Sequence, residues 1–119
     1  MNSALSGIRV LDFSRILAGP FCAMNLADLG AEVIKIEKPE TGDDSRAFGP
    51  FVGDQSGYYI LLNRGKKSIT LDLKSPAAKE IIYEMIRQSD VIVENFKPGV
   101  MDKLGFSYET LKELNPGLI

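Results

Sequence analysis

Four lysines stand at or shortly after the ends of short apolar runs of the sequence. Lys38, Lys74 and Lys97 follow the runs VIKIE, ITLDL and DVIVE, and Lys103 comes shortly afterwards. Ammonium groups gathered around one crevice would attract a ligand that carries phosphate groups. At any single position, an ordinary solvated lysine is the competing interpretation, because most lysines in folded proteins are exposed.

The composition excludes several other kinds of site and partner. The chain has no histidine and one cysteine, which excludes Ser-His and Cys-His nucleophile systems and an internal disulfide. No HExxH or CxxC spacing is present, so we expect no metal site. The formal net charge of −2 gives no general attraction to nucleic acid or to a membrane, so we expect neither as a partner.

Two acids and one arginine are further candidates for chemistry. Glu37 ends its run where an acid often binds the ribose of NAD, but the preceding turn, DFSRILAG, lacks the G-x-G-x-x-G pattern. We therefore disfavour NAD and interpret Glu37 as the end of a strand. Asp12 is expected to cap the turn that follows it, and RGKK is expected to be a solvated turn. Arg46 either forms an ion pair that orders its loop or anchors a carboxylate.

The elements that must position these residues follow from the apolar periodicity. We predict strands over 8–13, 31–37 and 90–95, and a basic turn that leads into a strand over 64–73. Helices are predicted over 20–29, from Ser75-Pro76 to about 87, and over 107–114. Strands that alternate with helices indicate an α/β fold, here a Rossmann-like parallel sheet with flanking helices. Ligands of such sheets bind outside the carboxyl ends of the strands, which is where the lysines stand.

Several local predictions complete this outline. The helix over 20–29 is apolar nearly all round, so we expect it, with Cys22, to be buried on every side by additional protein. Residues 38–57 are expected to form a long surface loop, and 58–63 either a helix or a strand. Gly30 and Gly99 are expected at positive φ.

The length of 119 residues fits one domain, so we assign 1–119 to a single unit with no second domain. The last residues, Leu118 and Ile119, look like the start of another strand, and we therefore expect 1–119 to be part of a larger fold. No segment has the pattern of a signal peptide or a membrane span, and we expect a cytoplasmic protein.

Several motifs together support a resemblance to a known family. GIRVLDFSRILAGPFCAMNLADLGAEVIKIEKPETGDDSR, NRGKKSITLDLKSPAAKEII, DVIVENFKPGVMDKLGF and LKELNP occur in this order between Gly7 and Pro116. In this order they resemble the N-terminal part of the large domain of class III coenzyme A (CoA) transferases, the family of formyl-CoA transferase and carnitine CoA-transferase. The family also includes α-methylacyl-CoA racemase.

The resemblance implies a CoA site at matching positions. Ile16, Leu17 and Ala18 would lie along the thioester arm, while Lys38 and Lys103 would bind phosphate. The residues flanking the adenine and its ribose phosphate would be Leu71, Asp72, Leu73 and Lys74, and those lining the pantetheine and nucleotide would be Asn95, Phe96 and Lys97. Formyl-CoA transferase has glutamine where this chain has Leu17, which implies a specificity other than formyl or oxalyl.

The resemblance also implies a reaction and partners. Family transferases exchange CoA between an acyl-CoA thioester and a carboxylic acid acceptor through an aspartyl-CoA thioester. The nucleophilic aspartate lies beyond the position of Ile119, so no catalytic residue is assigned in this chain, which would be inactive alone. CoA is a substrate, no tightly bound cofactor is implied, and family members are interlocked homodimers. The alternatives are an acyl-CoA racemase of the same family and a non-catalytic CoA-binding module.

Overall fold

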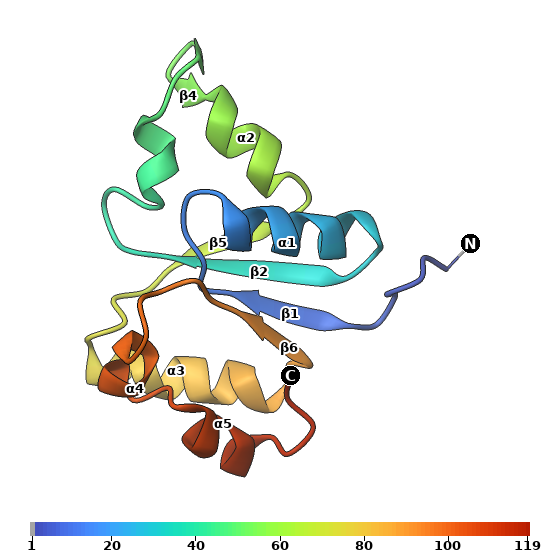
Figure 1. Ribbon diagram of the computed structural model, residues 1–119, viewed down its shortest axis with the longest axis vertical. Coiled ribbons are helices and arrows are strands. Elements are labelled where there is room, and N and C mark those ends of the chain that lie inside the picture. The colour runs from blue at the N-terminus through green and yellow to red at the C-terminus, as the bar shows by residue number, and fades with distance from the viewer. Residues whose placement is uncertain (1) are drawn as a thin grey trace.

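The computed structural model describes residues 2–119 and has a four-stranded parallel sheet at its centre (Figure 1). The strands follow the order β5-β2-β1-β6 across the sheet. Their bounds are β1 Arg9–Asp12, β2 Glu32–Glu37, β5 Lys67–Thr70 and β6 Val91–Val93. Because all four strands are parallel, the loops that follow them emerge at the same edge of the sheet. The Rossmann-like fold class predicted from the sequence is confirmed.

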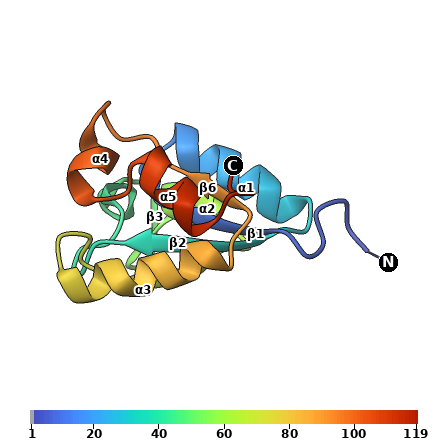
Figure 2. The same cartoon turned by 90° about the horizontal axis from the view of Figure 1, so that it is seen from below.

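Helices cover both faces of the sheet (Figures 1 and 2). The helices α1 (Ala18–Asp28) and α2 (Gly57–Asn63) lie on one side and contact each other. On the other side lie α3 (Pro76–Arg87), α4 (Val100–Leu104) and α5 (Tyr108–Leu114). The sheet is therefore the middle layer of three, as its buried, apolar strands require.

Successive residues of the strands point to opposite faces and build two cores. Val10 and Val33 pack with Ala23 of α1 in one core. Leu11 packs with Ile82 of α3 and other apolar residues in the second core. The period of two in the strands therefore decides which helix each strand residue meets.

The region from 38 to 57 is more ordered than a simple surface loop. It contains a 3₁₀ helix, η1 (Asp44–Ala47), and two short paired strands, β3 (Phe51–Val52) and β4 (Gln55–Ser56). The next segment, which the sequence left open between helix and strand, is α2. Its first turn is capped by the Ser56 hydroxyl, which accepts a hydrogen bond from the Tyr59 amide at 3.1 Å.

The sequence predicted that additional protein buries α1 and Cys22 on every side, and residues 2–119 alone leave part of this surface open. Ala23 and Met24 are buried against the sheet, but Phe21 and Leu29 are about half exposed at 52% and 51%, and Cys22 is exposed. The sheet covers one side of α1 and α2 covers part of another, which leaves an apolar outer face.

The last residue pairs with the free side of β6. The Ile119 amide donates to the Asp90 carbonyl at 3.0 Å, and the Ile119 carbonyl accepts from the Ile92 amide at 2.8 Å. This alternation is the hydrogen-bond pattern of parallel strands, so Ile119 has the strand character that the sequence indicated.

Gly30 and Gly99 adopt positive φ angles of 102° and 86°, as predicted. No helix among residues 2–119 has the length and apolar character needed to cross a lipid bilayer.

Candidate functional site

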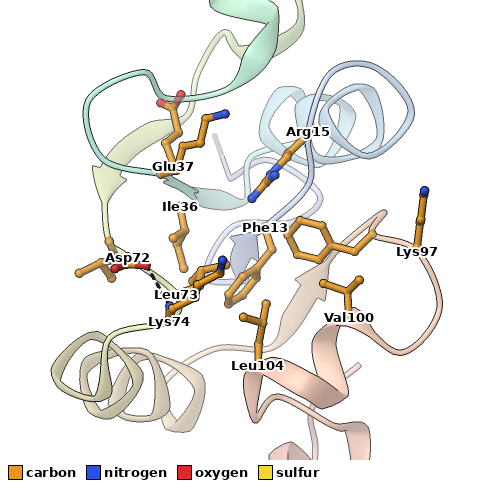
Figure 3. Close-up of a pocket in the computed structure, with 13 residues that line it drawn as sticks. Phe13, Arg15, Ile36, Glu37, Asp72, Leu73, Lys74, Lys97, Val100 and Leu104 are labelled. Carbon is orange, nitrogen blue, oxygen red and sulfur yellow. Dashed lines mark hydrogen bonds between the residues drawn. The ribbon is translucent and has the colours of Figure 1, made fainter.

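A cavity of about 570 Å³ opens at the carboxyl ends of the parallel strands (Figure 3). Its walls come from the ends of β1 and β2, the loops that follow β5 and β6, and helix α4. The lining residues are Phe13, Arg15, Ile36, Glu37, Lys38, Leu71, Asp72, Leu73, Lys74, Phe96, Lys97, Val100 and Leu104. The sequence predicted a ligand site at this edge of the sheet, and a cavity of this size can hold a small organic ligand.

The cavity combines an apolar interior with four cationic side chains. Apolar side chains such as Phe13, Ile36 and Leu104 form the interior, as Figure 3 shows. Arg15, Lys38, Lys74 and Lys97 supply positive charge, while Glu37 and Asp72 are the acids. This arrangement suits an anionic ligand that also carries apolar or aromatic groups.

Of the two acids in the lining, Glu37 is neutralised by an ion pair with Arg46, whereas Asp72 is exposed. Glu37 is buried and bonded to Arg46, as described below, and the Asp72 carboxylate accepts a hydrogen bond from the Lys74 amide at 3.0 Å. The side chains of Lys38 and Asp44 form an exposed ion pair, with Nζ 2.5 Å from Oδ1. Exposed pairs of this kind contribute little to stability, so the Lys38 ammonium can exchange Asp44 for a phosphate at small cost.

Seven of the residues assigned from the sequence line the cavity together: Lys38, Leu71, Asp72, Leu73, Lys74, Phe96 and Lys97. The other five do not line it. Ile16 and Leu17 lie in the turn between β1 and α1, Ala18 begins α1, and Lys103 is exposed on α4.

Asn95 has its side-chain amide engaged by backbone. Its Oδ1 accepts from the Arg15 amide and its Nδ2 donates to the Arg15 carbonyl, both at 2.9 Å. This pair of bonds fixes the backbone of Arg15, whose guanidinium carbon lies 5.0 Å from the centre of the Phe96 ring. Asn95 therefore supports the cavity through Arg15, and the cation–π contact places a positive charge on an apolar wall.

The residues that sequence reasoning missed are Phe13, Arg15, Ile36, Glu37, Val100 and Leu104. Arg15 follows the first strand closely and could have been found by the strand-end rule that identified the lysines. Phe13 and Ile36 belong to the ends of apolar runs and could have been predicted by the same rule. Val100 and Leu104 belong to α4, which lies beyond the strand ends that this rule covers.

Glu37 ends β2, as the sequence predicted, and its carboxylate also binds side chains from other segments. Its carboxylate accepts hydrogen bonds from Arg46 Nε at 2.8 Å and Nη2 at 2.7 Å, and from the Tyr59 hydroxyl at 2.9 Å. The Ser68 hydroxyl and the Asp43 amide donate as well, at 2.5 and 2.7 Å. Of the two interpretations of Arg46, the structure has the ion pair that orders the loop.

These partners change the proton affinity of the groups involved. Burial by itself raises the pKa of Glu37, but the hydrogen bonds from Arg46, Ser68, Asp43 and Tyr59 outweigh it and lower that pKa to about 2. Burial and the neighbouring Glu37 charge raise the pKa of the Tyr59 phenol. Glu37 is therefore a permanent anion at neutral pH, and it holds η1 and α2 beside the end of β2.

The expected solvated turn at RGKK is also corrected. The Lys66 side chain is buried, and its Nζ lies 2.8 Å from Asp12 Oδ2, 2.9 Å from Asn63 Oδ1 and 3.0 Å from the Pro20 carbonyl. Asp12 also accepts from the Ser14 amide at 2.9 Å, which confirms its predicted role in the turn. Burial lowers the pKa of Lys66, while Asp12 opposes that effect. Lys66 supplies the charge that a buried carboxylate requires.

No group of three metal-ligating side chains is placed to hold a metal ion within the described part of the chain.

The comparison with known proteins decides the family. The family model described as CoA-transferase family III matches residues 5–119. The chain belongs to this family. Acetyl-CoA:oxalate CoA-transferase from Acetobacter aceti is 55% identical over 113 residues, which are 95% of this chain and 29% of that protein. Succinyl-CoA:glutarate CoA-transferase from Homo sapiens is 51% identical over 116 residues, 97% of this chain and 26% of that protein.

Solved structures of two similar proteins share the fold. A CAIB/BAIF family protein from Brucella suis superposes with a TM-score of 0.92 at 45% identity, covering 100% of this chain and 32% of that chain. A hypothetical protein from Mycobacterium tuberculosis gives a TM-score of 0.90 at 43% identity, covering 98% of this chain and 32% of that chain. The resemblance drawn from the sequence is confirmed, and the chain spans about a third of these relatives.

Proposed function

We propose that residues 1–119 form the Rossmann-like, CoA-binding N-terminal portion of an acyl-CoA:carboxylate CoA-transferase. The observation that supports this most directly is the cavity of about 570 Å³, in which four cations surround an apolar interior. CoA needs both features, because its nucleotide carries phosphates and its pantetheine arm is largely uncharged. CoA and acyl-CoA are substrates in this proposal, and no tightly bound cofactor is invoked.

The parts of CoA are distributed over the cavity and its rim. Phosphates would meet Lys38 and Lys103, and the adenine with its ribose phosphate would lie against residues 71–74. The pantetheine would pass Phe96 and Lys97 toward the turn at Ile16, Leu17 and Ala18, where the thioester arm would lie. Arg15 adds a fourth cation of the cavity, and its rigid fork of donors suits a phosphate.

The proposed reaction is a CoA exchange by covalent catalysis on an aspartate in the remainder of the protein. The aspartate carboxylate attacks the thioester carbon of the donor, the C–S bond breaks, and a mixed anhydride and CoA thiolate form. The thiolate then attacks the aspartyl carbon, which releases the donor acid and leaves an aspartyl-CoA thioester. The acceptor carboxylate attacks that thioester, which releases CoA thiolate and forms a second mixed anhydride. The thiolate then attacks the acceptor's acyl carbon in this anhydride, which forms the product acyl-CoA and restores the aspartate.

A dicarboxylic acid is the proposed acceptor. The relatives from Acetobacter aceti and Homo sapiens are named for oxalate and glutarate, which are both dicarboxylic acids. Leucine at position 17 has no hydrogen-bonding group for a small polar acyl group, which argues against a formyl or oxalyl specificity. A racemase of the same family would use the same CoA site, but the named relatives favour a transferase. A cytoplasmic location and an interlocked homodimer stay predictions.

Isothermal titration of CoA into the full-length protein tests the binding site. Lys74→Ala should raise the Kd about tenfold, since a charge-assisted hydrogen bond contributes on the order of 1.5–3 kcal/mol. The difference should shrink as salt is raised, because salt screens the interaction. Lys67→Ala is the matched control, because Lys67 is 70% exposed, pairs with Glu32 and does not line the cavity.

Equal affinity of Lys74→Ala and the wild-type protein would refute the CoA site. The reaction is tested by incubating the protein with succinyl-CoA and glutarate and following glutaryl-CoA. Mass spectrometry of the protein should show a gain of CoA minus water. Acyl-CoA epimerisation without acceptor-dependent exchange would favour the racemase, and binding without either reaction would favour a binding module.

A further inference from the structure

The backbone of the turn between β1 and α1 is unusual at Ile16, which has a φ of 67°. A positive φ is rare for residues other than glycine, and for a β-branched side chain it is a genuine outlier. Such backbone persists only where surrounding groups over-determine it. The neighbours of this turn should therefore include groups whose purpose is to hold it.

Three side chains from three different segments hold three consecutive residues of the turn. Lys35 of β2 donates from Nζ to the Ser14 carbonyl at 3.0 Å. Asn95, after β6, bonds both backbone groups of Arg15. The Asp43 carboxylate accepts from the Ile16 amide, with its two oxygens 3.2 and 3.3 Å from the nitrogen.

Lys35 and Asp43 also form an ion pair with each other. Their charged atoms are 2.8 Å apart, and each side chain is 1% exposed. Asp43 Oδ1 accepts further from the Ser45 amide and hydroxyl at 2.9 and 2.8 Å, which fixes it at the start of η1. Burial by itself raises the pKa of Asp43, but Lys35 and Ser45 outweigh burial, and that pKa lies below its usual value. Asp43 is therefore an anion at neutral pH, paired with the Lys35 side chain.

The pair lies directly behind the wall of the cavity. Arg15, Ile36, Glu37 and Lys38 line both the cavity and a small adjoining hollow that Lys35 and Asp43 also line. Neither Lys35 nor Asp43 lines the cavity itself. In Figure 3, Arg15 reaches from the turn toward Phe13 and the interior. The turn that carries Arg15 connects the pair to the cavity.

We propose that Lys35 and Asp43 are positioning residues, which hold the turn at Ile16 in its left-handed conformation and thereby direct Arg15 into the CoA cavity. The role rests on the proposed function, because Arg15 is assigned there to the phosphates of CoA. Gly19 supports the same geometry from the other side. A Cβ at Gly19 would lie 2.1 Å from the Ser14 Cβ, so the turn and the first residues of α1 are in direct contact.

A double-mutant cycle in the full-length protein separates positioning from stability. Asp43→Asn or Lys35→Met alone leaves a buried charge without its partner and should lower the Tm. The double variant contains neither charge and should recover most of that loss. We expect its Kd for CoA to stay at least tenfold above the wild-type value, because the turn is then held by Asn95 alone, without the charged contacts of Lys35 and Asp43.

Arg15→Ala distinguishes an effect through the turn from any other loss of affinity. It should raise the Kd about tenfold in the wild-type background and have little further effect in the double variant. A double variant with recovered Tm and a Kd within twofold of wild type would overturn the proposal. The proposal would also be overturned if Arg15→Ala raised the Kd for CoA about tenfold further in the double variant.

Amide hydrogen exchange at Ile16 is the readout that does not require CoA. Exchange should be slow in the wild-type protein and at least tenfold faster in Asp43→Asn, while amides of α3 stay unchanged. Unchanged exchange at Ile16 in Asp43→Asn would contradict the positioning role. This test uses the single variant, so it still applies if the double variant does not fold. A wild-type protein that does not bind CoA would instead contradict the proposed function, and exchange at Ile16 would still decide the role of the pair.

Discussion

Replacing Glu37 by glutamine tests how much the charge at the end of β2 stabilises the fold. The pKa of Glu37 falls from 4.5 to about 2 in the structure. At about 1.4 kcal/mol for each pH unit, this difference corresponds to about 3 kcal/mol of folding free energy at neutral pH. Glu37→Gln keeps the size of the side chain but removes the charge that Arg46 pairs with. We therefore expect the free energy of unfolding at pH 7 to fall by about 3 kcal/mol.

The sign of the pH dependence follows from the direction of the pKa change. The folded-state pKa lies below the unfolded value, so the contribution is fully present above about pH 5 and is lost as the pH falls toward 2. Other carboxylates titrate in the same range, but they are common to both proteins. The difference between wild type and Glu37→Gln should narrow from about 3 kcal/mol at pH 7 to about 1 kcal/mol at pH 3.

Equilibrium urea unfolding at pH 7, 5 and 3 measures this difference. Glu84→Gln is the matched control, because Glu84 is an exposed glutamate that also pairs with an arginine, Arg87. That variant should unfold like the wild type at each pH. A Glu37→Gln difference that stays constant from pH 7 to pH 3, or that is below about 1 kcal/mol at pH 7, would refute the reasoning.

Three further predictions follow from the contacts around the site. Gly19→Ala should destabilise the protein by about 2 kcal/mol or more in thermal melts, because the added Cβ would overlap Ser14. Gly117→Ala is the control: its Cβ would make only an ordinary contact at 3.7 Å, so this variant should melt like the wild type. In urea unfolding, Lys66→Met should lower the free energy of unfolding by about 3 kcal/mol or more, because it leaves Asp12 buried without its partner. Lys67→Met removes one partner of an exposed pair and should lower that free energy by at most about 1 kcal/mol. In a spectrophotometric pH titration, Tyr59 should ionise at a higher pH than an ordinary tyrosine, since burial and Glu37 raise its pKa. Tyr59→Phe should remove this late-ionising tyrosine from the titration curve. A curve for Tyr59→Phe identical to that of the wild type would contradict the buried contact.

The sheet and the place of the site could be predicted from the sequence because both depend on local patterns. Apolar runs that alternate with an amphipathic helix indicate a parallel sheet, and its carboxyl edge is where Lys38, Lys74 and Lys97 line the cavity. The rule for the strand ends applies equally to Arg15, which follows the end of β1 and also lines the cavity.

The charged groups behind the site could not be predicted, because their partners come from distant segments. Glu37 is bonded by side chains from residues 46, 59 and 68, and no periodicity relates these positions. Lys35 did carry one signal: a lysine in the middle of the apolar run VIKIE must be buried if the strand is central, and a buried lysine requires a partner. Which acid supplies that partner is decided only by the path of the loop that contains Asp43.

The central claim is that the cavity at the carboxyl ends of the strands binds CoA. A crystal structure of the full-length protein with CoA tests it most directly. We predict that CoA occupies this cavity, with its phosphates near Lys38, Arg15 or Lys74 and its pantetheine passing Phe96 toward the turn at Ile16. CoA bound elsewhere on the protein, with this cavity empty, would contradict it.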